Sequence, residues 1–228
     1  MAKNTRKDYD AHLNKTIFAI KHQRTFVMIK PDGVMRGLIG EILHRIEEAG
    51  LKIAAMKMLL PDEKLIRSHY PTSDEAWIAR LGTKAKSGLD GTGLNALEVY
   101  GTEDDAGLGK NALAGLMEYM QSGPVVAMVV EGIQSIDMMR KLCGNTLPFK
   151  AERGTIRGDY SVDNPIVANV EGRSIHNLIH ASENPVEANN EIKLWFGEEM
   201  IHDYSLGNDD IMYCKHYHCS PDPDGVVE

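Results

Sequence analysis

In the stretch Asn177-Leu178-Ile179-His180-Ala181-Ser182, an apolar pair brings one histidine to the end of a predicted short strand. A helix is expected to follow at once, with Asn184 as its N-cap, Pro185 at its first position and Glu187 completing a capping box. A histidine beside a helix N-terminus is well placed to meet an anion such as phosphate. Taken alone, the same pattern is more typical of a buried structural histidine, so its interpretation depends on the rest of the chain.

Hydrophobic spacing around this stretch predicts three further strands and a series of helices. Continuous apolar runs predict strands at residues 24–30, 51–60 and 124–130, of which the last is expected to be buried on both faces. Helical spacing predicts helices at residues 39–49, 61–70 and 113–120, together with one that Ser73 caps and Gly82 ends, and one that Ser135 caps. The pattern alone indicates a mixed α/β or α+β domain built in two layers.

Changes in composition divide the chain into an arm, a domain and a tail. Residues 1–23 form a polar N-terminal arm, residues 24–207 one domain, and residues 208–228 a C-terminal tail that we expect to be mobile. Residues 71–111 are rich in glycine and small residues, which is typical of an insertion of helix and loop. Residues 91–96 fit a dinucleotide-binding fingerprint, but no predicted strand precedes them, so a loop is the favoured interpretation.

Overall composition excludes several classes of protein. The 228-residue chain has a formal net charge of -8, which argues against nucleic acid or anionic membrane as a partner. We expect no signal peptide and no membrane span, since the N-terminus is charged from Lys3 and no apolar run approaches ~20 residues. Three scattered cysteines make no disulfide framework, so a cytoplasmic location is expected. Adjacent ligands in the strip Cys214–Cys219 are poorly arranged for tetrahedral zinc, so we expect no metal there.

Four separated motifs could carry chemistry. They are residues 29–34 (IKPDGV), 123–128 (GPVVAM), 154–159 (GTIRGD) and 177–182 (NLIHAS). Lys30 and Arg157 could direct two cations into one cleft, although either residue alone is more typical of solvated surface charge. In this order and with this spacing, the four motifs closely resemble the nucleoside diphosphate kinase family over residues 24–70 and 112–204.

The resemblance implies a fold, a reaction and an assembly. The implied fold is α+β and ferredoxin-like, a four-stranded antiparallel sheet with helices packed on it, plus the helical and loop insertion at residues 71–111. The implied reaction moves the γ-phosphate of a nucleoside triphosphate to a nucleoside diphosphate by a ping-pong mechanism through a phosphohistidine. Mg²⁺ is expected on the nucleotide phosphates, with no protein metal ligand. The chain is expected to form a homo-oligomer, either a hexamer or a tetramer.

The resemblance also assigns roles to individual residues. His180 matches the transiently phosphorylated nucleophile, and Glu191, supported by Ser182, matches the carboxylate that holds its ring. Tyr70 matches a residue near that ring and the phosphate, and Leu116 matches one wall of the base slot. The residues that match phosphate and sugar ligands are Lys30, Arg140, Thr146, Arg157 and Asn177.

Elementary chemistry agrees with these roles. An imidazole with a reference pKa near ~6.5 is largely a neutral nucleophile at pH 7. A carboxylate that accepts a hydrogen bond from one ring nitrogen fixes the tautomer and leaves the lone pair of the other nitrogen free to attack phosphorus. A transferring phosphoryl group needs charge stabilisation more than proton chemistry, which explains several cations in one pocket.

The sequence departs from the family pattern at the base slot and around the histidine. The family often carries an aromatic residue near Ala112, where neither this residue nor its neighbour is aromatic, and the insertion could supply Trp77 or Tyr100 instead. The arginine usual before the asparagine is replaced by His176 or displaced to Arg173, and the sequence does not decide between them.

These departures leave two other functions open. The usual Ser-Asp after the histidine is Ser182-Glu183 here, one methylene longer, so a regulatory protein that binds nucleotide but turns over poorly is one alternative. A nucleic-acid-binding protein is the other, and the negative net charge disfavours it.

Overall fold

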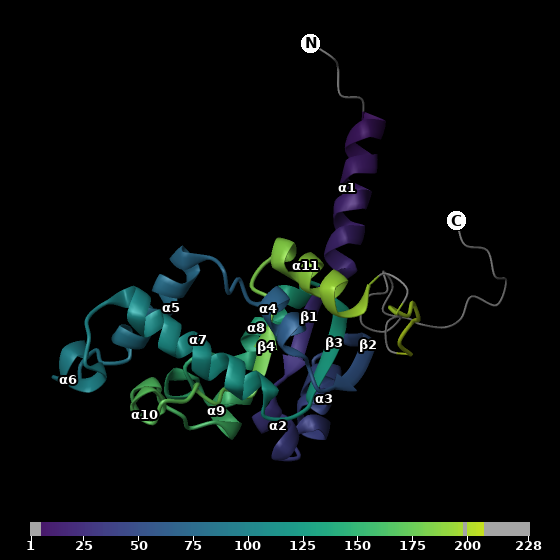
Figure 1. The fold of residues 1–228 in the computed structure, drawn as a ribbon. Coiled ribbons are helices and arrows are strands. Elements are labelled where there is room, and N and C mark those ends of the chain that lie inside the picture. The colour runs from purple at the N-terminus through teal and green to yellow at the C-terminus, as the bar shows by residue number, and fades with distance from the viewer. Residues whose placement is uncertain (1–5, 198–199, 208–228) are drawn as a thin grey trace, which may run out of the picture.

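A four-stranded antiparallel sheet forms the centre of the computed structural model, which describes residues 6–197 and 200–207 (Figure 1). The strands are β1 (Gln23–Ile29), β2 (Lys52–Leu59), β3 (Val125–Gly132) and β4 (Ile179–Ala181). Their order is β2-β3-β1-β4, and each neighbouring pair is antiparallel. The α+β, ferredoxin-like prediction is therefore confirmed, and so are the four predicted strands.

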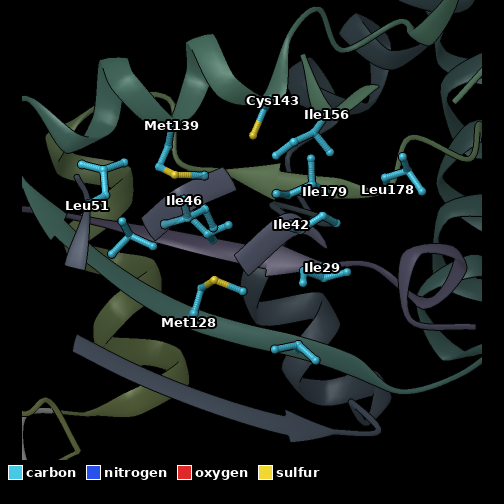
Figure 2. Close-up of a cluster of buried hydrophobic side chains, with 13 residues drawn as sticks. Ile29, Ile42, Ile46, Leu51, Met128, Met139, Cys143, Ile156, Leu178 and Ile179 are labelled. Atoms are coloured by element: carbon cyan, nitrogen blue, oxygen red, sulfur yellow. The ribbon is translucent and has the colours of Figure 1, made fainter. Parts of the chain in front are cut away.

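Helices cover both faces of this sheet, so the expectation of two layers is wrong. Alternate residues of β1 point to opposite faces, as the period of two in a strand requires. On one face Val27 and Ile29 pack against α3 (Ile39–Glu48) and α8 (Ser135–Cys143), as Figure 2 shows for Ile29. On the other face Phe26 and Met28 pack against α4 (Glu63–His69), α11 (Pro185–Phe196) and the end of α7 (Asp105–Gln121). The central strands are buried on both faces for this reason.

Two long helices, α5 (Glu75–Ser87) and α7, pack against each other; α5 lies within the predicted insertion at residues 71–111, and α7 begins there and continues to Gln121. The predicted end of α5 at Gly82 is wrong, because that glycine is a packing position inside the helix. A Cβ atom on Gly82 would overlap the carbonyl oxygen of Asp105, and one on Gly109 would overlap that of Ile78. The two glycines therefore let the helix backbones approach closely.

The N-cap residue also differs from the prediction at two helices, α5 and α8. Asp74, not Ser73, caps α5 by accepting hydrogen bonds from the amides of Ala76 and Trp77. Ser135 does not cap α8. Its hydroxyl donates to the Gln23 carbonyl oxygen instead.

Asn184 caps α11 as predicted, accepting from the amides at positions 186 and 187. The Glu187 carboxylate accepts from the Glu183 amide at 2.5 Å, one residue earlier than a capping box requires. The N-terminus of α11 is thus fixed by two side chains.

The remaining elements are short, apart from the N-terminal helix α1 (Arg6–Lys21), which projects from the body (Figure 1). They are α2 (Pro31–Met35), α6 (Ala96–Tyr100), the 3₁₀ helix η1 (Pro148–Lys150), α9 (Ile156–Tyr160) and α10 (Pro165–Val170). Residues 91–96 lead into α6 and follow a helix, which agrees with the predicted loop. The tail at 208–228, with the strip Cys214–Cys219, lies outside the described residues. Within the described ranges, none of the helices combines the length and the apolar character that a membrane crossing requires.

The close approach of α5 and α7 generates a stability prediction. Gly109→Ala should lower the free energy of unfolding by about 1–3 kcal/mol, which is the range for an overpacked site. The added methyl group would overlap the backbone carbonyl of Ile78, which is fixed within helix α5. Urea unfolding measures the change. Gly40→Ala is the matched control, since its Cβ would meet nothing within 4 Å and alanine favours a helix by about 1 kcal/mol. Equal midpoints for the two variants would contradict the packing account.

Candidate active site

A chain of hydrogen bonds fixes His180 between the sheet and α11. His180 lies on β4 opposite Met28 of β1, and its Nε2 is 2.8 Å from Oε1 of Glu191. The Ser182 hydroxyl donates to the other Glu191 oxygen at 2.6 Å and accepts from the Phe26 amide at 3.2 Å. The Glu191 carboxylate therefore engages one ring nitrogen, and Nδ1 has no hydrogen-bond partner within residues 6–197 and 200–207.

The backbone before His180 is bent into an unusual conformation. Leu178 has a φ of 67°, in the left-handed region that a leucine rarely adopts. Its carbonyl oxygen accepts from the Lys30 amide at 2.8 Å, and its side chain is fully buried. This bend puts Asn177 and His180 on the same pocket, and strain of this kind is concentrated at functional sites.

Two buried cations lie beside the histidine. The Lys30 ammonium donates to Asn177 Oδ1 at 2.7 Å. The Arg157 guanidinium donates to the carbonyl oxygens of Asn177, Gly144 and Ile179 at 3.0, 2.7 and 2.5 Å. Carbonyl groups hold Arg157, and no carboxylate of the described residues pairs with it, so its positive charge favours an anion in the pocket.

The pKa values follow from burial and from these charges. Burial, and then the charge of Arg157, lower the pKa of Lys30 to about 7. Burial lowers the pKa of His180 to about 3, with the positive charges of Lys30 and Arg157 adding to the effect. Burial raises the pKa of Glu191, and the Ser182 hydroxyl opposes that shift. His180 is therefore a neutral imidazole at pH 7, and its unpartnered nitrogen carries a lone pair.

His69, at the end of α4, is a site residue that the sequence analysis missed. Its Nδ1 lies 3.4 Å from Glu191 Oε1 and accepts from the Trp195 indole at 3.3 Å. Its ring meets the His180 ring edge-on at 4.8 Å. Burial lowers the pKa of His69 to about 3, so this ring is neutral as well. The available signal was its position next to Tyr70 at the end of a predicted helix.

The sequence analysis also missed Asp32 and Tyr119, which lie beside Lys30. The Tyr119 hydroxyl donates to Asp32 Oδ1 at 2.5 Å, and the Lys30 ammonium lies 5.6 Å from the centroid of the Tyr119 ring. Burial and the Asp32 carboxylate raise the pKa of Tyr119, so the phenol stays protonated. The Lys30 ammonium thus has a defined position.

One cavity of about 370 Å³ joins most of the predicted site residues. Eight of them line it: Lys30, Tyr70, Leu116, Arg140, Thr146, Arg157, Asn177 and His180. Glu191 and Ser182 lie behind the histidine ring and outside the cavity lining, where they can orient the ring without meeting a ligand. Arg140 lies 3.6 Å from the Glu183 carboxylate at the edge of the same cavity.

The sequence left open whether Trp77 or Tyr100 completes the base slot, and whether Arg173 or His176 takes the place of the family arginine. The structure places one residue of each pair at the cavity. Trp77 lines the cavity, whereas Tyr100 is outside the lining and donates to the Ala85 carbonyl oxygen at 3.3 Å. Arg173 lines the cavity and pairs with Asp163 at 2.6 Å. His176 does not line it and stacks on Tyr119 at 4.8 Å.

The donor groups around the cavity also indicate how a metal ion could bind. His69, His180 and Glu191 offer three ligand atoms within 4.8 Å of one another, among the described residues. Two imidazoles suit zinc or copper better than Mg²⁺, which prefers oxygen ligands, and binding there would remove Glu191 from His180. The carboxylates that line the cavity are those of Glu183 and Glu187, whose oxygens fit Mg²⁺ carried by a phosphate ligand.

Comparison with known proteins identifies relatives of this site and fold. The family model described as nucleoside diphosphate kinase matches residues 23–81 and 102–201. A nucleoside diphosphate kinase of Pyrobaculum aerophilum is 44% identical over 179 residues, which cover 78% of this chain and 97% of the relative. One of Borreliella burgdorferi is 37% identical over 197 residues, covering 86% and 98%.

Solved structures give the same result. An NDP kinase from Pyrobaculum aerophilum superposes with a TM-score of 0.74 at 42% identity, covering 80% of this chain and all of the other. A transition state mimic of the Borrelia burgdorferi enzyme, with bound vanadate and ADP, has a TM-score of 0.68 at 36% identity and covers 85% and 98%. A halophilic enzyme from Halobacterium salinarum in complex with CDP has a TM-score of 0.61 at 32% identity and covers 84% and 99%.

The lowered pKa of His180 generates a prediction for NMR. The ring ¹⁵N signals of His180, identified by their loss in His180→Gln, should not show the large shift of ring protonation between pH 8 and pH 5, because the group protonates only near pH 3. In Lys30→Met the pKa of His180 should rise, since one of the neighbouring positive charges is gone. A titration midpoint near the ordinary value of ~6.5 in the parent protein would contradict the burial account.

Proposed function

Because this chain belongs to the nucleoside diphosphate kinase family and transfers the γ-phosphate of a nucleoside triphosphate to a nucleoside diphosphate, we propose that His180 carries the phosphoryl group. One observation carries the proposal: Glu191 holds Nε2, while Nδ1 belongs to a ring that faces Lys30 and Arg157 across the cavity. The neutral imidazole supplies the lone pair that a nucleophile needs.

The proposed reaction consists of two matching transfers. In the first, the Nδ1 lone pair forms a bond to the γ-phosphorus, and the bond from that phosphorus to the β–γ bridging oxygen breaks. The diphosphate leaves with the electron pair. In the second, a terminal oxygen of another nucleoside diphosphate attacks the phosphohistidine, and the phosphorus–nitrogen bond breaks. The hydrogen bond from Nε2 to Glu191 stabilises the positive charge that the ring gains on phosphorylation.

We propose that the cavity cations bind the phosphate chain during both transfers. Lys30, Arg140 and Arg157 are the cations among the predicted phosphate ligands, and Thr146 and Asn177 add hydrogen-bonding groups. Leu116 offers an apolar wall for the base, and Tyr70 lies against His69 with a ring distance of 4.5 Å. Preorganised positive charge of this kind stabilises the transition state of phosphoryl transfer.

Mg²⁺ is proposed as an ion that enters with the nucleotide. The phosphates would hold it, with the carboxylates of Glu183 and Glu187 as acceptors for its water ligands. When bound, it would neutralise part of the phosphate charge. The positive side chains of the pocket bind the remaining negative charge.

We further propose a homo-oligomer, a hexamer or a tetramer, in the cytoplasm. The edge strand β2 supports an assembly, because Met56 and Met58 are about half exposed on it and Leu60 follows at 65% exposure. The cytoplasmic location rests on the scattered cysteines of the sequence.

A labelling experiment tests the role of His180. With [γ-³²P]ATP and Mg²⁺ the protein should form an acid-labile phosphoenzyme that any nucleoside diphosphate discharges. His180→Gln should abolish labelling and lower turnover by roughly a thousandfold or more, while ADP affinity stays within a few fold because the cations bind the phosphates. His44→Gln, an exposed histidine of α3, is the control that should label normally.

The same experiment separates the enzyme from a protein that only binds nucleotide. Retained nucleotide without labelling of the parent protein would support the regulatory alternative. Normal turnover in His180→Gln would refute the proposed nucleophile.

The pKa of Lys30 generates a second prediction, for proton uptake. At pH 8 an ammonium with a pKa of about 7 is mostly neutral, and bound phosphate favours its charged form. ADP binding at pH 8 should therefore take up roughly 0.9 proton at this group, and ADP affinity should fall as the pH rises above 7. Calorimetry in two buffers of different ionisation enthalpy measures the uptake. An uptake that persists in Lys30→Met would assign it to another group.

A further inference from the structure

Helix α5 of the insertion presents one face to the catalytic cavity. Trp77, Leu81 and Lys84 follow one another at helical spacing, and all three line the cavity that contains Lys30 and His180. The facing helix α7 contributes residues 112 and 116 to the same lining. The insertion is therefore part of the wall of the active site.

The position of this face is fixed by close packing. The glycines at positions 82 and 109 bring α5 and α7 into backbone contact, and Asp74 caps the start of α5. Near its other end, Lys86 pairs with Asp105 at 2.5 Å and donates to the Glu103 carbonyl oxygen at 2.8 Å. Rigid elements of this kind hold a binding group in a defined direction.

Lys84 differs from Lys86 in having no partner for its charge. Its ammonium makes no ion pair and no hydrogen bond in the part of the chain that the structure describes. Its positive charge acts on Lys30, since Lys84, after burial and Arg157, lowers the pKa of that residue. Lys84 thus adds a further cation to a pocket in which Arg157 has no carboxylate partner among the described residues, and an anion would relieve the repulsion between these charges.

We propose that Lys84 binds the phosphate chain of the nucleotide, so that the insertion contributes a ligand to the substrate site. Trp77 and Leu81 form the apolar part of the same wall. The inference rests on the proposed role of the cavity as the nucleotide site, and it adds a residue that the four family motifs do not contain. Lys84 binds the substrate and takes no part in the bond changes at His180, which involve the groups around that ring.

Lys84→Met tests the proposal against a control from the same helix. Arg80→Met removes one positive charge from an exposed residue of α5 that is outside the cavity lining. Lys84→Met should raise the dissociation constant of Mg·ADP and the nucleotide KM about fivefold to tenfold, the effect of one charge-assisted hydrogen bond, with kcat within twofold. Arg80→Met should change neither constant by more than twofold, and Lys84→Arg should restore most of the affinity.

Two further ligands identify the part of the nucleotide that Lys84 meets. Inorganic pyrophosphate should lose affinity for Lys84→Met as ADP does, whereas adenosine should bind both proteins equally. Trp77 gives the readout, because it is one of only two tryptophans in the chain and the other, Trp195, is buried. Equal losses in Lys84→Met and Arg80→Met, or a loss for adenosine as large as for ADP, would overturn the proposal.

The experiment on Lys84 can be interpreted independently of the labelling experiment that tests His180. Lys84→Met should still be labelled on His180 to full stoichiometry at saturating ATP. If the parent protein failed to label, the nucleophile assignment would fail, and the dissociation constants of ADP and pyrophosphate would still decide the role of Lys84.

Discussion

The hydrogen bond between Glu191 and His180 is the contact on which the site depends, and it joins the short strand β4 to the helix α11 that follows it. Glu191 comes from α11, His180 from the three-residue strand β4, and Ser182 ties both to the backbone of Phe26 on β1. The strand is too short to be stable by itself and is held by its pairing with β1. The orientation of the imidazole is therefore a property of the whole sheet, because a shift in the register of β4 would move the ring away from Glu191.

The pocket around this contact is positively charged, whereas the molecule as a whole is negatively charged. The chain carries a formal charge of -8, yet Lys30, Arg140 and Arg157 meet in one cavity. Short distances and burial make these cations count more than remote surface carboxylates, which solvent and salt screen. Burial, with the charges of Lys30 and Arg157 adding to it, lowers the pKa of His180 and keeps the ring neutral, so one arrangement would attract a phosphate and preserve the lone pair proposed to attack it.

The sequence predicted the parts of this molecule that depend on local patterns. Apolar runs located the four strands, and the family resemblance named eight residues that line one cavity. Where the prediction failed, the deciding partner lies elsewhere in the chain. The local pattern predicts a helix end at Gly82, but in the fold this glycine is needed because the backbone of Asp105 occupies the space that a side chain would fill. His69 has the pattern of an ordinary helix residue, and only the fold brings it to Glu191. The capping box is a local exception, in which Glu187 accepts from the Glu183 amide and not from that of Asn184.

A single helix, α7, connects α5 and the cavity to the core. The C-terminal half of α7 contributes Met120 to the buried cluster on the sheet and Leu116 to the cavity, while its N-terminal half packs against α5. Because one continuous helix makes all three contacts, a change in how α5 packs would be transmitted to the cavity wall. The backbone approach at Gly82 and Gly109 makes the insertion behave as a rigid extension of the domain. The paired helices α5 and α7 can in this way form part of the cavity wall without altering the sheet that orients His180.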